Sequence, residues 1–179
     1  MAAMTGSPMT ASQTIGPFWH LIDEPFWHDL TRFGAEGERI ALCGRITDGE
    51  GAPVADAAVE LFQASPERSP RFPGYGRCAT DACGMFHFTT VKPGTLPGPR
   101  GANAPQAPHC GLALFARGLL QPLFTRLYFA GEELNETDPI LALIDPARRG
   151  TVVATQTASG AWRLDIVLQG EGETVFLDF

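Results

Sequence analysis

The chain has 179 residues, which is enough for one domain with a hydrophobic core. A formal net charge of −7, with no basic block, argues against nucleic-acid binding. Hydrophobic residues make up 44% of the chain, yet no apolar stretch reaches the roughly 20 residues that a membrane span needs. The polar start, residues 1–10, lacks the features of a signal peptide. We therefore expect a soluble, cytoplasmic protein.

The N-terminal part has two predicted sections. Residues 1–11 are small and polar, and we expect them to be disordered. Residues 12–19 read Ser-Gln-Thr-Ile-Gly-Pro-Phe-Trp, an extended arm with a Gly-Pro turn signal. Trp19, Phe26 and Trp27 make the region aromatic, so it is expected to dock on a surface. Residues 12–179 are then predicted to form one domain.

From residue 39 onward the pattern indicates β-structure. The chain contains 20 glycines and 15 prolines, a composition typical of short strands and many turns. Apolar residues alternate along several segments, as expected for strands with one buried face. A helical segment is predicted only near 139–144, and a hairpin turn at 157–160. The expected strands are 39–47, 57–63, 85–91, 109–116, 124–129, 151–156, 161–169 and 174–179.

Two long loops interrupt these strands, at 65–77 and 92–108. Short strands with such loops predict an all-β fold, a β-sandwich of about eight mostly antiparallel strands with an extended N-terminal arm. Long loops of a sandwich gather at the ends of its sheets and often build sites. Because the loops flank the strand that begins at His109, we expect catalytic or binding residues to lie near this strand.

Few residues could hold a metal. A site of two tyrosines and two histidines would need Tyr75, Tyr128, His109 and a further histidine to converge. Tyr75 lies in a predicted loop, whereas Tyr128 lies in an apolar run and is expected to pack against a sheet. His87 alternates with phenylalanines and is expected to face away from the core. His109 is predicted to be a lone, hydrogen-bonded structural histidine.

Other catalytic signatures are weak. No Gly-x-Ser-x-Gly motif occurs. The cysteine spacings fit neither a zinc site nor a disulfide framework, so free and partly buried thiols are expected. Arg117, at a strand end, and Arg126, in the next strand, could bind a carboxylate through two hydrogen bonds. Surface salt bridges are the alternative for both.

Ordered motifs over residues 12–179 carry a resemblance to a known family. They are Ser-Gln-Thr-Ile-Gly-Pro at 12–17, Thr-Val-Lys-Pro-Gly at 90–94, Ala-Pro-His at 107–109, Leu-Phe-Ala-Arg-Gly at 114–118, Thr-Arg-Leu-Tyr-Phe at 125–129 and the C-terminal run at 169–179. Together they resemble the α subunits of protocatechuate 3,4-dioxygenases, which are intradiol ring-cleaving enzymes.

The resemblance implies two homologous chains, of which the β subunit holds Fe(III) through two tyrosines and two histidines. Strands that bind this iron carry Arg-Pro-x-His-x-His. Residues 106–111 here read Gln-Ala-Pro-His-Cys-Gly. His109 fills the first histidine position, Gly111 the second, and Gln106 stands in place of the arginine. The chain is therefore expected to bind no metal, with His109 as a vestigial ligand position.

The resemblance also implies a substrate-binding role without catalytic residues in this chain. The matching positions are Thr14, Gly16, Pro17 and Phe18 of the arm, together with Arg117. Tyrosine is common in the family where Phe18 stands, so a pocket hydroxyl is missing here. These residues are expected to line a pocket built around the iron of the β subunit.

The implied reaction belongs to the complex. Protocatechuate and O2 would react at the Fe(III) of the β subunit to give 3-carboxy-cis,cis-muconate, in a higher α–β oligomer. This chain alone is expected to be inactive. Two alternatives stay open: a homodimeric dioxygenase with its own iron, and a non-catalytic, transthyretin-like β-sandwich that works as a binding module.

Overall fold

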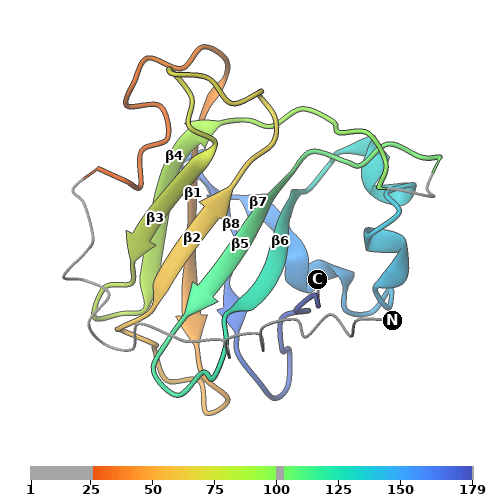
Figure 1. Ribbon diagram of the computed structural model, residues 1–179. Helices are drawn as coiled ribbons and strands as arrows, with labels where there is room; N and C mark the ends of the chain where they lie inside the picture. Colours follow the sequence, from red (N-terminus) through yellow and green to blue (C-terminus); the bar gives the residue numbers. More distant parts are fainter. Residues whose placement is uncertain (1–25, 100–102, 179) are drawn as a thin grey trace, which may run out of the picture.

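A computed structural model describes residues 26–99 and 103–178 as two packed layers of strands (Figure 1). The strand order is β3-β2-β5-β6-β7-β8-β1-β4, and β9 pairs with β1. The all-β expectation is confirmed, and the pairs are antiparallel except β6–β7, β1–β8 and β1–β9. The strands are β1 (Arg39–Thr47), β2 (Ala58–Phe62), β3 (Tyr75–Ala79), β4 (Met85–Val91), β5 (His109–Phe115), β6 (Leu123–Phe129), β7 (Val153–Gln156), β8 (Trp162–Arg163) and β9 (Ile166–Val167).

The core lies between the layers and follows the alternation of the strands. On β4, Phe86 and Phe88 are each 1% exposed, whereas His87 between them faces solvent as expected. Gly44 of β1 pairs with Phe86, and a Cβ at Gly44 would lie 2.6 Å from that ring. The glycine therefore makes room for a buried aromatic side chain.

Most predicted strands are confirmed to within two residues, but three predictions are wrong. Residues 75–79 form β3 rather than the end of a loop, because this short strand lacks the β-branched residues that signal one. The expected strand at 161–169 is split, since the Asp165 carboxylate accepts the Arg45 N–H (2.9 Å) and interrupts the ladder. Residues 174–178 form no strand and make single hydrogen bonds, such as Leu177 N–H to the Phe124 carbonyl (2.8 Å).

Residues 26–30 lie between the two end strands of the sheet order, β3 and β4. The Trp27 carbonyl accepts the Arg77 N–H (3.2 Å), and Leu30 N–H donates to the Thr89 carbonyl (2.9 Å). The Trp27 ring packs edge-on against Tyr75, with centroids 5.9 Å apart. This part of the aromatic N-terminal region therefore docks on the chain's own sheet, while residues 1–25 lie outside the described part.

Three short 3-10 helices follow β6 and sit beside it (Figure 1): η2 (Glu133–Glu136), η3 (Leu141–Leu143) and η4 (Arg149–Val152). The helical prediction near 139–144 is confirmed as η3. Leu141, Ile144 and Val152 pack with Tyr128 in a second small core. Across residues 26–99 and 103–178, no helix has the length and apolar character of a membrane span.

The thiols vary in burial. Cys78 and Cys110 are buried, Cys43 is half-buried and Cys83 is exposed, and none of the four is in a disulfide. The prediction of free cysteines is confirmed, with Cys83 more exposed than expected.

Candidate functional site

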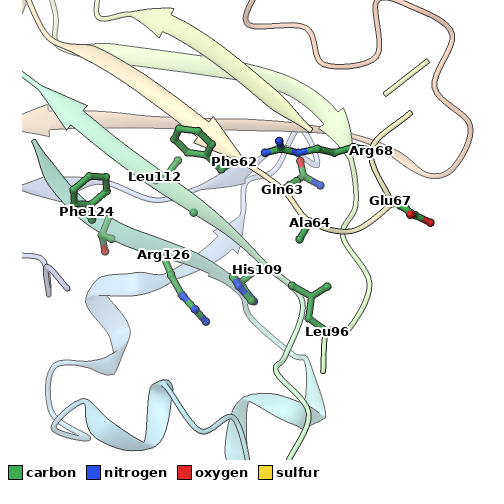
Figure 2. Close-up of a pocket in the computed structure, with 12 residues that line it drawn as sticks. Phe62, Gln63, Ala64, Glu67, Arg68, Leu96, His109, Leu112, Phe124 and Arg126 are labelled. Carbon is green, nitrogen blue, oxygen red and sulfur yellow. The ribbon is translucent and has the colours of Figure 1, made fainter. Parts of the chain in front are cut away.

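A hollow of about 610 Å³ lies on the outer face of the β2–β5–β6 layer (Figure 2). His109 and Gly111 are two residues apart on β5 and share this face. The two predicted long loops form part of its rim, as expected for a sandwich. The lining residues are Phe62, Gln63, Ala64, Glu67, Arg68, Leu96, His109, Gly111, Leu112, Phe124, Thr125 and Arg126.

His109 is held in one orientation. Its Nδ1 lies 2.8 Å from the Ala107 carbonyl, so Nδ1 carries the proton and donates to that oxygen. Burial lowers the pKa of His109, and the nearby Arg126 charge acts in the same direction. The ring is therefore neutral near pH 7. The prediction that His109 is hydrogen-bonded is confirmed, and its structural role stays a prediction.

Gly111 forms the floor of the hollow. It pairs with Phe62 on β2 and with Arg126 on β6, so these three positions form one row across the sheet. A Cβ built at Gly111 would meet only Phe62 atoms, at 3.8 Å. A Cβ would thus fit there without a clash, so the glycine leaves open space above the strand.

Arg126 is fixed by neutral partners. Its Nη1 donates to Gln106 Oε1 (2.8 Å) and to the Tyr128 hydroxyl (3.2 Å). Gln106 in turn donates to the Pro97 carbonyl (2.7 Å), and its backbone pairs with Leu96. Gln106 therefore fixes both the guanidinium and the loop that carries Leu96.

A buried carboxylate lies behind this row. Asp138 is fully buried, and its Oδ2 accepts the Ala107 N–H (2.7 Å). Its Oδ1 accepts the Leu141 N–H (2.9 Å), the Ile140 N–H (2.8 Å) and the Tyr128 hydroxyl (3.2 Å). These donors satisfy the carboxylate, which ties the start of β5 to η3.

The donor set does not fit Fe(III). Gly111 offers no side-chain ligand, and burial raises the pKa of Tyr128 while its hydroxyl is bound to Asp138. The Tyr75 hydroxyl donates to Glu60 (2.8 Å), and burial with this carboxylate raises the pKa of Tyr75 to about 12. Tyrosinate ligands would need the opposite shift. Within the described ranges, no three His, Cys, Asp or Glu side chains converge.

Tyr75 is not a loop residue, as the sequence suggested, but begins β3. Its partners form a cluster that sequence reasoning missed. Arg77 pairs with Glu60 and lies 5.2 Å from the Trp27 ring centroid. The strand register places Glu60 opposite Arg77, but that signal required β3 to be recognised.

Arg117 lies at the other end of β5 from His109 and does not line the hollow. Its side chain is 72% exposed and forms an ion pair with Asp56. Leu120, on the same β5–β6 connection, is 90% exposed. The structure therefore separates Arg117 from His109. Thr14, Gly16, Pro17 and Phe18 lie outside the described residues.

Two aromatic residues of the hollow also escaped sequence reasoning. Phe62 and Phe124 are 37% and 40% exposed, on the outer face that a sandwich usually makes polar. The alternation of side chains along each strand could have identified them, because Phe62 follows the buried Leu61 and must therefore point to the opposite face. Aromatic residues out of phase with the core mark a surface that binds something.

Comparisons with known proteins identify the family of this chain. Residues 23–170 match the family model described as Dioxygenase. The chain is 40% identical to the protocatechuate 3,4-dioxygenase alpha chain of Pseudomonas putida, covering 96% of this chain and 97% of that one. It is 34% identical to the beta chain of Burkholderia cepacia, covering 84% of this chain and 74% of that one.

A solved structure gives the same fold. The dioxygenase domain of a dioxygenase and carbohydrate-binding fusion from Streptomyces sp. SirexAA-E superimposes with a TM-score of 0.62 at 23% identity, covering 95% of this chain and 96% of that one. With the family model and the sequence relatives, this establishes that the chain belongs to the intradiol ring-cleavage dioxygenase family.

Proposed function

We propose that this chain is the non-iron-binding α subunit of a heteromeric protocatechuate 3,4-dioxygenase. Identity alone separates α from β relatives only modestly, at 40% against 34%. The observation that carries the proposal is the row of Gly111 and Arg126 beside His109. It puts a glycine where the family resemblance expects the second histidine ligand, and an arginine directly across the sheet from it.

The iron is then held by the β partner, where Fe(III) serves as Lewis acid and template for the reaction of protocatechuate with O2. The role of this chain is to bind and orient the substrate at the edge of the partner's site. Thr14, Gly16, Pro17 and Phe18 are proposed to line that pocket. Arg117 is proposed to attract the substrate carboxylate.

The placement of Arg117 supports a role toward a partner. Its guanidinium is exposed and lies away from the hollow of its own chain. The exposed Leu120 beside it provides apolar surface for docking. Because Arg117 pairs with Asp56, a substrate carboxylate would share or replace that contact.

The family match favours this hypothesis over the transthyretin-like binding module. A cytoplasmic location is also proposed, in line with the free cysteines. The test is co-expression with a tagged β chain. A stable complex with equal amounts of both chains supports the proposal. If this chain purifies as a monomer that does not bind the β chain, the hypothesis of a transthyretin-like binding module is favoured instead.

A further inference from the structure

The hollow beside His109 has the size and the lining of a small-molecule site, and Arg117 is not among its lining residues. Its volume of about 610 Å³ lies within the range of small-molecule sites, about 300–1,000 Å³. It combines an apolar wall with one fixed cation, which is the pattern of a site that orients a ligand. This inference does not rest on the proposed function, because Arg117 lies outside the hollow.

Arg126 supplies the anion-binding group. Its side chain is half-buried, and among the described residues it has no ion-pair partner. Its hydrogen-bond partners are the neutral Gln106 and Tyr128, and the nearby Asp138 accepts hydrogen bonds from four donors, one of which is the Tyr128 hydroxyl. A half-buried guanidinium is stabilised by a carboxylate, to which it can donate two hydrogen bonds.

The remaining charges leave the hollow positive. Arg68 lines it from the loop after β2, with Glu67 beside it. Figure 2 shows Glu67 at the far end of the hollow from Arg126, beyond Leu96 and Ala64. His109 is neutral near pH 7, because burial and Arg126 lower its pKa. An incoming anion thus meets Arg126 with Glu67 at the other end of the hollow, and with the buried Asp138 carboxylate behind the Tyr128 hydroxyl.

The apolar walls select a flat ring. Phe62 on β2 and Phe124 on β6 flank β5, so their strands are roughly 10 Å apart by normal strand spacing. Phe62 pairs with Gly111, and Phe124 pairs with Ala113 two residues farther along β5, so the two rings stand diagonally across β5. The floor beside Phe62 is Gly111, which has no side chain. A ring placed there can contact both phenylalanines, with Leu96 at its end.

We propose that this hollow binds a small aromatic carboxylate, with Arg126 donating to the carboxylate and the ring lying over Gly111 between Phe62 and Phe124. Gln106 is a positioning residue, since it holds Arg126 and the loop of Leu96 at once. The network exists without a ligand, so little ordering is lost on binding. We expect a Kd on the order of 0.1 mM for a ligand of this size.

The test uses 4-iodobenzoate and the full chain in the assembly in which it purifies. Equilibrium dialysis should show that the wild type binds 4-iodobenzoate. The Kd should rise tenfold or more in Arg126→Met and in Gly111→Leu. The second variant fills the hollow without removing the charge, and it stays informative if the first fails to fold. Arg71→Met, which removes an exposed arginine paired with Glu36, should bind as the wild type does.

Soaked crystals locate the site. An anomalous iodine peak between Phe62 and Phe124, with the carboxylate on Arg126, supports the proposal. Uncharged 4-iodobenzyl alcohol should give no peak there. The proposal is overturned if the peak is absent, if Gly111→Leu and Arg126→Met leave it unchanged, or if dialysis detects no Kd below about 10 mM. A peak at a partner's iron alone counts against this inference and leaves the proposed function intact.

Discussion

Gly111 of β5 lies directly across from Arg126 of β6, so the strand position opposite the arginine has no side chain. The pairing explains two properties of the chain at once. It removes a ligand from the place where the family resemblance puts a second histidine, and it adds a charge that repels a metal cation. The same pairing opens the hollow in which Arg126 can meet an anion.

Restoring the histidine alone should not restore iron binding. In Gly111→His, His109 and the new ring share one face, but Tyr128 stays bound to Asp138 and Tyr75 to Glu60. We expect less than about 0.1 iron per chain after incubation with ferric salt, since most metal sites need three or four ligands. Iron is counted by plasma emission spectrometry. Stoichiometric iron in Gly111→His would show that the tyrosines are available after all.

Removing the Arg117 charge should weaken the binding of substrates that carry a carboxylate more than the binding of those that lack one. In the α–β complex, Arg117→Ala should raise KM for protocatechuate about 10- to 100-fold, the loss of one charged hydrogen bond. The KM for catechol, which lacks the carboxylate, should change by about twofold or less. Steady-state O2 uptake measures both. Equal changes for the two substrates, or none, would remove Arg117 from the substrate pocket. Arg71→Ala is the matched control.

Gly44 should tolerate no side chain. A Cβ there would lie 1.9 Å from the Leu164 carbonyl oxygen and 2.6 Å from the Phe86 ring. Gly44→Ala should therefore lower the free energy of unfolding by about 3 kcal/mol or more, because neither the ladder nor the packed ring can move freely. Urea unfolding measures this. Gly150→Ala, where the added Cβ meets nothing within 4 Å, should change stability by about 0.5 kcal/mol or less.

The lowered pKa of His109 links stability to pH. Burial depresses the pKa in the folded state below the unfolded value of about 6.5, so the unfolded chain binds more protons below that pH. The stabilising effect is complete above about pH 6.5 and is lost as the pH falls toward the folded pKa.

Urea unfolding of wild type and His109→Gln at several pH values tests this. Glutamine can keep a hydrogen bond to the Ala107 carbonyl but does not titrate. The wild type should lose more of its free energy of unfolding than His109→Gln as the pH falls from 7.5 to 5.5, because only the wild type carries the lowered pKa. Parallel stability curves for the two proteins would show that His109 titrates normally in the folded state.

Sequence reasoning recovered the strands whose side chains alternate, because burial on one face dictates that pattern. It recovered β4 in full, with Phe86 and Phe88 inside and His87 outside. It missed β3, whose pattern comes from glycine, cysteine and half-buried polar residues rather than β-branched ones. It overextended the C-terminus, where apolar residues alternate without a partner strand to complete a ladder.

For the site, the spacing of His109 and Gly111 was enough to place both on one face, since strand periodicity is a local property. The register that sets Arg126 opposite Gly111 is not local, because it depends on how β5 and β6 align. The same holds for Gln106, which reaches Arg126 across 20 positions of sequence. The separation of Arg117 from His109 followed from strand length alone and could have been foreseen.

The central claim is that this chain works as the iron-free member of an α–β pair. The most direct measurement is iron content together with protocatechuate-dependent O2 uptake, for the chain alone and for the complex co-expressed with a β chain. The account predicts that the chain alone holds no iron and consumes no O2, whereas the complex holds about one iron per α–β pair and is active. Stoichiometric iron and turnover in the chain alone would contradict it.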